Sequence, residues 1–333
     1  MRSERLSLAL EAGAIELPAA GRILVLRPRA GDDLSALPVD RLDVVTGFRP
    51  DFDALRARGL AVSAEIPGDG YAAALVCLPR ARDLARALLA EASARVAPGG
   101  VVIVDGQKTD GVESVHKELR QIGAAPGGAL SKAHGKIFAF AAGADLSPWA
   151  SRDTLVEGGF TTRPGVFSAD GPDRGSMLLA AALPEKLPMH VADLGAGWGY
   201  LSRAVLERPG VQTLHLIEAE ALALDCARLN VTDPRAQFHW ADATTWTHKG
   251  PTFGAIVCNP PFHTGREADP SLGLAFIRAA AGLLSTSGTL WLVANRHLPY
   301  DQLLNLLFKE VEDVGGDRGF RVIRAARPLK ARP

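Results

Sequence analysis

The chain has 333 residues, which is long for one hydrophobic core and suits two domains of about 150 residues each. Hydrophobic residues make up 47% of the sequence and charged residues 22%, and 37 Lys and Arg balance 37 Asp and Glu. These values exclude a disordered chain and a generally basic, histone-like surface, so a nucleic-acid partner would have to bind a local basic patch.

The three cysteines, Cys77, Cys226 and Cys258, lack a metal-binding spacing such as C-x-x-C, and two of them lie inside apolar runs. We therefore expect buried thiols and a reducing compartment. The N-terminus carries Glu4 and Glu11 and does not resemble a signal peptide, and the apolar stretches are far shorter than a membrane span. We expect a cytoplasmic protein, monomeric, with neither a metal ion nor a membrane partner.

In the N-terminal half, residues 23–26 form an apolar run that ends at Arg27, in a turn without a glycine cluster. A second apolar run, residues 74–78, precedes a stretch rich in Ala, Leu and Arg, which predicts a strand and then a helix. A glycine turn at 98–100 leads into a third predicted strand at 101–104. Residues 146–160 contain Ser147-Pro148-Trp149 and little periodicity, so we predict a linker there between domains 1–145 and 161–333.

In the C-terminal half, an apolar strand at 191–194 runs into a turn containing Gly195, Gly197 and Gly199, and a helix follows near Leu201. Glycines at such a turn let a ligand approach the backbone closely, and the helix N-terminus offers free N–H groups. The dinucleotide-binding fingerprint would need its third glycine where this chain has Tyr200, so the spacing argues against NAD.

Polar residues end the predicted strands of this half. Asp193, Glu218, Asp242 and Asn259 stand at the carboxyl ends of four successive strands. Open α/β sheets bind ligands at this edge, so we expect the four side chains to share a site. An acid in the place of Glu218 can accept from ribose hydroxyls, and Asp242 with its neighbouring backbone can meet an adenine amine.

The stretch Asn259-Pro260-Pro261-Phe262 follows the apolar strand 255–258. The prolines cannot continue a sheet ladder, so the strand presents the Asn259 amide and the carbonyl of Pro260 at its end. Together these oxygens can accept both hydrogens of an NH2 group, and Phe262 offers a flat face for a planar ring. The alternative is an ordinary turn that ends a strand, because Asn-Pro is a common turn opener.

The two halves share a pattern that predicts an internal duplication. Residues 74–79 match residues 255–260, and each match is followed by a helical stretch, a glycine turn and an apolar strand. This alignment places Leu78 and Arg80 at the positions of Asn259 and Pro261. Two unrelated α/β domains with similar strand patterns are the alternative.

This order of motifs resembles the class I S-adenosylmethionine-dependent methyltransferases, and most closely the ribosomal RNA small subunit methyltransferase C family, the guanine-N2 methyltransferases of 16S rRNA. The resemblance covers roughly residues 160 to 327 with specific motifs, and the N-terminal half only in architecture. It implies an α/β protein of two tandem Rossmann-like methyltransferase domains. The motifs that carry it are Pro164-Gly165-Val166-Phe167-Ser168, Asp173-Arg174-Gly175-Ser176 with Leu178-Leu179, Asn259-Pro260-Pro261-Phe262-His263 and Val293-Ala294-Asn295-Arg296-His297-Leu298-Pro299-Tyr300.

The resemblance also implies the cofactor S-adenosyl-L-methionine, with S-adenosyl-L-homocysteine as product, and ribosomal RNA or the small ribosomal subunit as partner. Around the cofactor it places Asp193, Gly195, Ala196 and Gly197 at the methionine part, Glu218 at the ribose, Asp242 and Ala243 at the adenine, and Asn259. The catalytic set that orients and stacks the guanine would be Asn259, Pro260 and Phe262, and the substrate contacts would be Phe167, Ser168, Pro261, Phe262 and His263. Ala196 and Trp198 depart from the family pattern but leave both glycines in place.

In the N-terminal half, the missing glycines and the residues Leu78 and Arg80 predict a degenerate domain that binds no cofactor and instead supports the second domain or positions RNA. We interpret His263 as structural or RNA-contacting, with a general base as the less favoured reading. The basic series from Arg318 to Arg332 is either an RNA-binding patch or a solvated strand edge.

Three other functions stay open from the sequence. They are guanine-N2 methylation of 23S rRNA, glutamine N5-methylation of a protein, and a non-catalytic role in RNA binding or ribosome assembly. Glutamine methyltransferases typically carry Tyr after the prolines, where this chain has Phe262. The intact glycines, acids and Asn259 argue against a non-catalytic protein.

Overall fold

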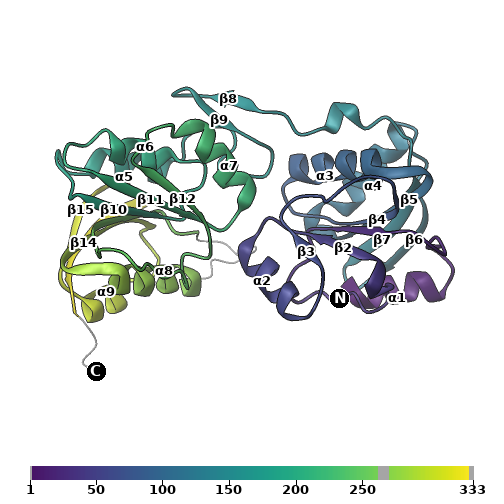
Figure 1. The fold of residues 1–333 in the computed structure, drawn as a ribbon, viewed down its shortest axis with the longest axis horizontal. Coiled ribbons are helices and arrows are strands. Elements are labelled where there is room, and N and C mark those ends of the chain that lie inside the picture. Colours follow the sequence, from purple (N-terminus) through teal and green to yellow (C-terminus); the bar gives the residue numbers. More distant parts are fainter. Residues whose placement is uncertain (1, 262–269, 330–333) are drawn as a thin grey trace. The chain divides into compact units, whose positions relative to one another are not determined.

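The computed structural model describes residues 2–261 and 270–329 and divides the chain into two compact units, residues 1–152 and 153–333 (Figure 1). The boundary falls inside the segment 146–160 that the sequence predicts as a linker. On one side of it Leu146 packs in the core of the first unit, and on the other Phe160 packs against Trp198 of the second. Both ends of this segment are therefore folded into their own units.

The first unit is built on a seven-stranded sheet in the order β3-β2-β1-β4-β5-β7-β6. The pairs from β3 to β5 are parallel, whereas β7 is antiparallel to β5 and β6. Its strands are β1 (Ile23–Leu26), β2 (Leu42–Val45), β3 (Val62–Ser63), β4 (Tyr71–Cys77), β5 (Val96–Gln107), β6 (Gly127–Lys132) and β7 (Gly135–Ala141). Its helices are α1 (Arg2–Glu11), α2 (Arg49–Ala57), α3 (Arg82–Arg95) and α4 (Val112–Gln121), with short 3-10 turns η1 (Val39–Arg41), η2 (Lys108–Asp110) and η3 (Ser147–Trp149).

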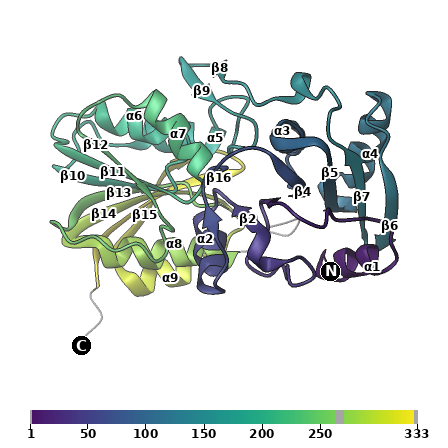
Figure 2. The ribbon, with the colours of Figure 1, turned by 45° about the vertical axis from the view of Figure 1, so that its right-hand side comes forward.

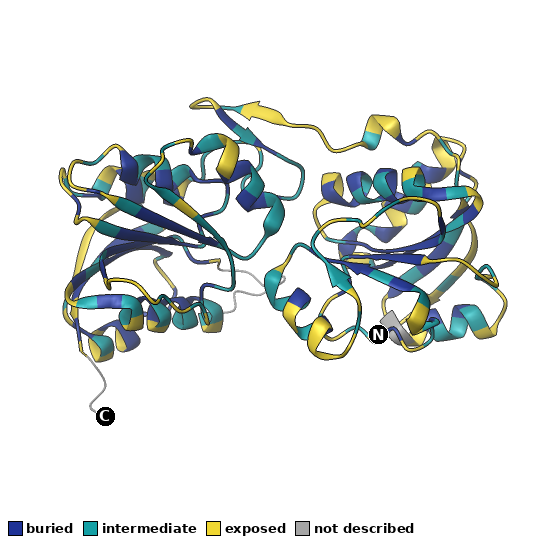
Figure 3. Ribbon diagram, in the orientation of Figure 1, coloured by how far each residue is buried: buried dark blue, intermediate teal, exposed yellow. Residues whose placement is uncertain are grey.

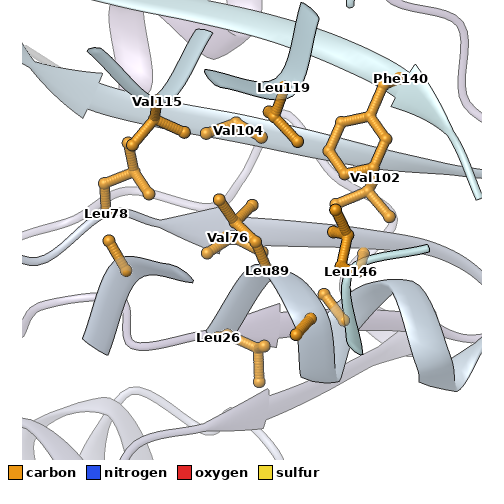
Figure 4. Packing of buried hydrophobic residues seen from close by; sticks show 14 of the residues in the cluster. Leu26, Val76, Leu78, Leu89, Val102, Val104, Val115, Leu119, Phe140 and Leu146 are labelled. Atoms are coloured by element: carbon orange, nitrogen blue, oxygen red, sulfur yellow. The ribbon is translucent and has the colours of Figure 1, made fainter. Parts of the chain in front are cut away.

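Apolar side chains on both faces of this sheet form its core. Figure 4 shows one face, where Val76 and Val104 of the strands pack with Leu89 of α3 and Val115 of α4. The opposite face packs against α1 and α2 through Leu6 and Leu55. Strands covered on both faces read as continuous apolar runs, which is why β1 is buried at every position.

The second unit has a seven-stranded sheet in the order β12-β11-β10-β13-β14-β16-β15 and a small hairpin of β8 (Thr154–Val156) and β9 (Phe160–Thr162). Its other strands are β10 (His190–Leu194), β11 (Thr213–Glu218), β12 (Ala236–Trp240), β13 (Phe253–Cys258), β14 (Leu284–Asn295), β15 (Phe308–Gly316) and β16 (Phe320–Pro328). Its helices are α5 (Arg174–Ala182), α6 (Tyr200–Leu206), α7 (Ala221–Asn230), α8 (Pro270–Leu283) and α9 (Asp301–Leu307). Figure 2 shows α8 and α9 on one face of this sheet and α5, α6 and α7 on the other, and Figure 3 shows the burial of the strands between them.

The two sheets repeat the same order strand for strand, which confirms the tandem Rossmann-like fold. Even the irregularities agree, because the register shifts between Tyr71 and Ala73 in β4 and between Phe253 and Ala255 at the matching place in β13. Two unrelated domains would not share such details, so the duplication is the better account.

The register also corrects one step of the sequence alignment. Ala73 pairs with Val101 after the shift in the first sheet, and Ala255 pairs with Thr289 after it in the second. Counting forward from these pairs, Asn259 corresponds to Cys77, and Pro261 corresponds to Pro79. The expected positions Leu78 and Arg80 are therefore wrong by one residue. Two short apolar segments can be aligned almost equally well when one is shifted by a single residue. In both alignments, the residue of the first unit that corresponds to Asn259 lacks an amide side chain.

Cys77, Cys226 and Cys258 are buried and form no disulfide, as expected for cysteines that serve as small apolar side chains. Among the described residues, no helix has the length and apolar character needed to cross a membrane. Over the same ranges, no group of three or more His, Cys, Asp and Glu side chains is arranged to hold a metal ion.

Candidate active site at the ends of β10 and β13

The chain order reverses between β10 and β13, since β11 and β12 lie on one side of β10 and β13 lies on the other. Leu194 and Cys258 are the last paired residues of these neighbouring strands, so Gly195 and Asn259 emerge side by side. Such a switch point at the carboxyl ends of parallel strands is the usual ligand crevice of an open α/β sheet. A pocket lies there, lined by Phe167, Asp173, Ser176, Gly195, Ala196, Gly197, Trp198, Tyr200, Leu201 and Asn259.

The glycine-rich turn forms one wall of this pocket. Gly195 and Gly197 have φ values of 75° and 55°, in the left-handed region that favours glycine. A Cβ atom added at Gly197 would meet no atom within 4 Å, so a side chain there would extend into open space. The turn thus leaves its backbone accessible to a ligand.

Glu218 braces the turn from the next strand. Its Oε2 accepts a hydrogen bond from the Gly197 N–H at 2.8 Å, and its Oε1 accepts from the Glu220 N–H at 2.7 Å. Burial raises the pKa of this carboxyl group, against the opposing effect of these N–H donors. Glu218 therefore touches the predicted cofactor turn, although it does not line the pocket itself.

Asp193 lies fully buried at the base of the turn. Its Oδ2 accepts a hydrogen bond from the Ser202 hydroxyl at 2.7 Å, whereas no described residue donates to its buried Oδ1. Burial raises the pKa of Asp193 to about 7, because a low-dielectric site disfavours the charged carboxylate. A buried carboxyl oxygen without a donor suits a ligand that carries an ammonium group.

Asn259 is held by its NH2 group. Its Nδ2 donates to Asp173 Oδ2 at 2.9 Å and to Ser176 Oγ at 2.8 Å. Because a carboxylate can only accept, these bonds fix which way the amide faces. The Oδ1 atom of Asn259 is buried and has no donor among the described residues. The side chain therefore presents a bare acceptor, which suits a ligand with an NH2 group.

Asp173 and Ser176 belong to this site, although the sequence reasoning gave them no role. Asp173 is the N-cap of α5 and accepts from the Ser176 backbone N–H at 2.9 Å. The visible signal was an Asp three residues before a Ser at the start of an apolar stretch, which is a helix-capping pattern. That pattern predicts the helix start, but the contact with Asn259, 86 residues away, depends on the sheet.

Trp198 joins the pocket to the segment before α5. Its Nε1 donates to the carbonyl oxygen of Phe167 at 2.7 Å, and its ring packs against Phe160 and Tyr200. The departure from the family pattern at this position thus fixes the backbone of Phe167, whose own side chain is 59% exposed beside the pocket.

Several predicted residues do not line the pocket. Ser168 has a left-handed backbone, with φ of 51°, and donates its hydroxyl hydrogen to Gly171 O. Asp242 forms a turn with Thr244, and Ala243 beside it is buried. Pro260 is buried and Pro261 is exposed. The predicted residues Phe262 and His263 lie outside the described part of the chain.

Three arginines of the basic series at the C-terminus pair with carboxylates. Arg321 forms a two-bond ion pair with Asp301, and Arg324 and Arg327 pair with Glu310. The interpretation as a strand edge therefore holds for these three residues. Arg318, at the other end of the series, is exposed, and no carboxylate within residues 2–261 and 270–329 pairs with it.

Comparisons with known proteins agree with this geometry. Residues 157–324 match the family described as Methyltransferase small domain. The chain is 34% identical over 273 residues to the ribosomal RNA small subunit methyltransferase C of Pseudomonas paraeruginosa, which covers 79% of this chain and 81% of that protein. It is 28% identical over 258 residues to the protein of the same name from Psychromonas ingrahamii, over 75% of this chain and 74% of that protein.

Among solved structures, the chain is similar to the 16S rRNA N2-guanosine methyltransferase of T. thermophilus in complex with AdoMet and guanosine. The TM-score is 0.82 at 25% sequence identity, over 98% of this chain and 91% of that chain. The fold, the sequence similarity and the pocket agree with one another, and the chain belongs to the ribosomal RNA small subunit methyltransferase C family.

Proposed function

We propose that this chain transfers the methyl group of S-adenosyl-L-methionine to the exocyclic N2 amine of a guanosine in 16S rRNA. The observation that carries the proposal is the buried Oδ1 of Asn259, which receives no hydrogen bond from residues 2–261 and 270–329, while the NH2 group of the same amide is held by Asp173 and Ser176. A fixed acceptor at a ligand crevice recognises an amine hydrogen, and guanine N2 carries two. The solved relative from T. thermophilus acts on guanosine 1207, and we propose the equivalent nucleotide here.

The residues of the turn suit S-adenosylmethionine. The Oδ1 of Asp193, which no described residue donates to, would receive a donor from the methionine ammonium group, and the turn of Gly195, Ala196 and Gly197, which lines the pocket, would hold the methionine chain. Glu218 would hold the ribose, while Asp242 and Ala243 would lie beside the adenine. When bound, the cofactor supplies an electrophilic methyl group on sulfur.

The reaction needs alignment more than acid–base chemistry. The N2 lone pair of guanine is delocalised into the ring, and acceptors at Asn259 Oδ1 and the Pro260 carbonyl would pull the NH2 group toward a tetrahedral shape. The N–C bond then forms as the C–S bond breaks, S-adenosylhomocysteine leaves, and the extra proton on N2 passes to water. Holding the two reactants in line supplies much of the acceleration. Phe262 would stack on the base, with Phe167, Ser168, Pro261 and His263 nearby.

The substrate guanosine must be unpaired or turned out of a helix, because N2 inside a duplex cannot face the methyl group in line. We propose that the enzyme works as a monomer in the cytoplasm, without a metal ion. The absence of disulfides among the three buried cysteines supports a reducing compartment.

We further propose that the first unit is a degenerate copy that binds no cofactor. In the matched registers, Val25 and Arg27 stand for Asp193 and Gly195, and Thr46 and Cys77 stand for Glu218 and Asn259. The backbone turn survives at Arg27, which keeps a left-handed φ of 54° and donates its N–H to Val45 O, as Gly195 donates to Ile217 O. The groups that would contact a cofactor are replaced, which leaves this unit to support the enzyme or position RNA.

The experiment is to incubate the protein and S-adenosylmethionine with 16S rRNA, and separately with small subunits, from a strain that lacks the gene. Mass spectrometry of the digested RNA should show one N2-methylguanosine. Methyl groups on another base, on 23S rRNA only, or on protein glutamine would contradict the proposal, and each would identify the alternative activity.

A further inference from the structure

We propose that a hollow near Asn259, lined by Arg174 and the loop 317–320, binds the phosphate backbone of unpaired RNA next to the target guanosine. The hollow holds about 430 Å³ and is lined by Arg174, Asp317, Arg318, Gly319 and Phe320. That volume is within the usual range for small-ligand sites. The inference rests on the proposed function and assigns it an RNA-contacting surface.

Continuous contacts connect the hollow to the active site. Asp173, which holds Asn259 at 2.9 Å, is followed directly by Arg174. A Cβ atom added at Gly175 would lie 3.0 Å from the Asp173 carboxylate and 3.3 Å from the Phe320 ring, so these two side chains flank one buried glycine. The hollow is therefore at the rim of the Asn259 pocket, where the strand entering the site would pass.

Asp317 is used to build the loop. Its Oδ1 accepts from the N–H groups of Gly319 and Phe320 at 2.7 and 2.8 Å, and its other oxygen pairs with Arg174. Arg296 fixes the same loop by donating from Nε to Asp317 O at 2.6 Å, and from its backbone N–H to Gly319 O at 3.0 Å. The loop is held in place and carries Arg318 outward.

The charged side chains around the hollow favour an anionic partner. Three exposed arginines contact or belong to the loop 317–320: Arg174 pairs with the Asp317 carboxylate, Arg296 donates to the Asp317 backbone oxygen, and Arg318 is part of the loop. Within β16, Arg321, Arg324 and Arg327 each have acidic partners, so the excess positive charge of this segment lies in the loop before the strand, at Arg318. Arginines beside an aromatic ring are typical of surfaces that bind single-stranded nucleic acid.

The test measures binding of the full-length protein to a short unpaired RNA with a single central guanosine, over a series of salt concentrations. Each phosphate contact on a single strand contributes about 0.7 to the slope of log affinity against log salt. Arg318→Gln should weaken binding at low salt and lower the slope by about 0.7, and the double variant with Arg174→Gln by about 1.4. Arg324→Gln, a paired arginine on the same strand, is the matched control and should leave the slope unchanged.

A second arm replaces the phosphates flanking the guanosine by neutral methylphosphonates. The wild type should then bind more weakly, and its difference from Arg318→Gln should disappear. Equal slopes for the wild type and Arg318→Gln, an equal drop in Arg324→Gln, or a difference that persists on the neutral RNA would each overturn the assignment. Unchanged cofactor affinity confirms that the variants are folded. Methylation of 16S rRNA by the wild type is scored separately, so that failure of the surface is distinguished from failure of the proposed function.

Discussion

The carboxylate of Asp173 contacts both the helix that it caps and the amide of Asn259, and substitutions separate the two roles. Asn is as good an N-cap as Asp, so Asp173→Asn should keep the stability of the protein. It removes a charged acceptor, which is worth about 1.5–3 kcal/mol, so methyl transfer should slow by about 10- to 100-fold. Asp173→Ala should lose both the rate and about 1 kcal/mol of stability.

Urea unfolding and single-turnover methylation measure the two effects. Asp233→Asn, at a turn elsewhere in the same unit, is the control and should change neither quantity strongly. Wild-type turnover by Asp173→Asn would show that Asp173 serves only as a helix cap.

The buried carboxyl group of Asp193 predicts a pH effect on the cofactor-free protein. Its pKa is about 7 in the folded state, above the ordinary value of 3.8, so between these values the folded chain holds a proton that the unfolded chain has lost. The contribution of Asp193 to the free energy of unfolding therefore falls as the pH rises from about 4 to 7, and it stays constant above that range. The Asp193→Asn variant has no ionisable group at this position. Its melting temperature, relative to that of the wild type, should therefore rise as the pH increases over this range. A difference that does not vary with pH would contradict the assigned protonation.

At the scale of elements, the turn between β10 and α6 should tolerate no large side chain. Gly197→Arg would project into the open space of the cofactor site and should abolish S-adenosylmethionine binding in a folded protein. Gly159→Arg is the matched control, because Gly159 also has a left-handed backbone and open space around its Cβ position but lies in the β8–β9 hairpin. Calorimetry measures both. Equal cofactor affinities in the two variants would place the cofactor elsewhere.

The elements around this turn could be predicted because their signals are local. The expected strand at 255–258 agrees with β13 to within two residues at each end, and β10, β11 and β12 end within two residues of Asp193, Glu218 and Asp242, as expected. The placing of Asn259 beside Gly195 followed from the rule for strand ends. The hydrogen bond between Asn259 and Asp173 could not be predicted in this way, and neither could the correspondence of Cys77 with Asn259. Both depend on which strands pair and in which register. A short sequence segment does not show which distant segment it pairs with.

At the scale of the molecule, the duplication predicts one cofactor per chain. The first unit keeps the sheet order and the turn at Arg27, but Val25, Thr46 and Cys77 offer none of the carboxylate and amide groups of the second unit. Titration of the full-length protein with S-adenosylmethionine should therefore give a stoichiometry of one. Two sites, or a single site that survives in Gly197→Arg, would show that the first unit binds the cofactor.

The central claim is that the amide oxygen of Asn259 orients the guanine amine, and single-turnover methylation of saturating 16S rRNA by Asn259→Ala tests it most directly. Such a contact matters most as the N–C bond forms, so cofactor and RNA affinities should stay near those of the wild type. The rate of methyl transfer should fall by about 100-fold or more, as is typical when one polar contact is lost from a dry site. Transfer at the wild-type rate would contradict the mechanism.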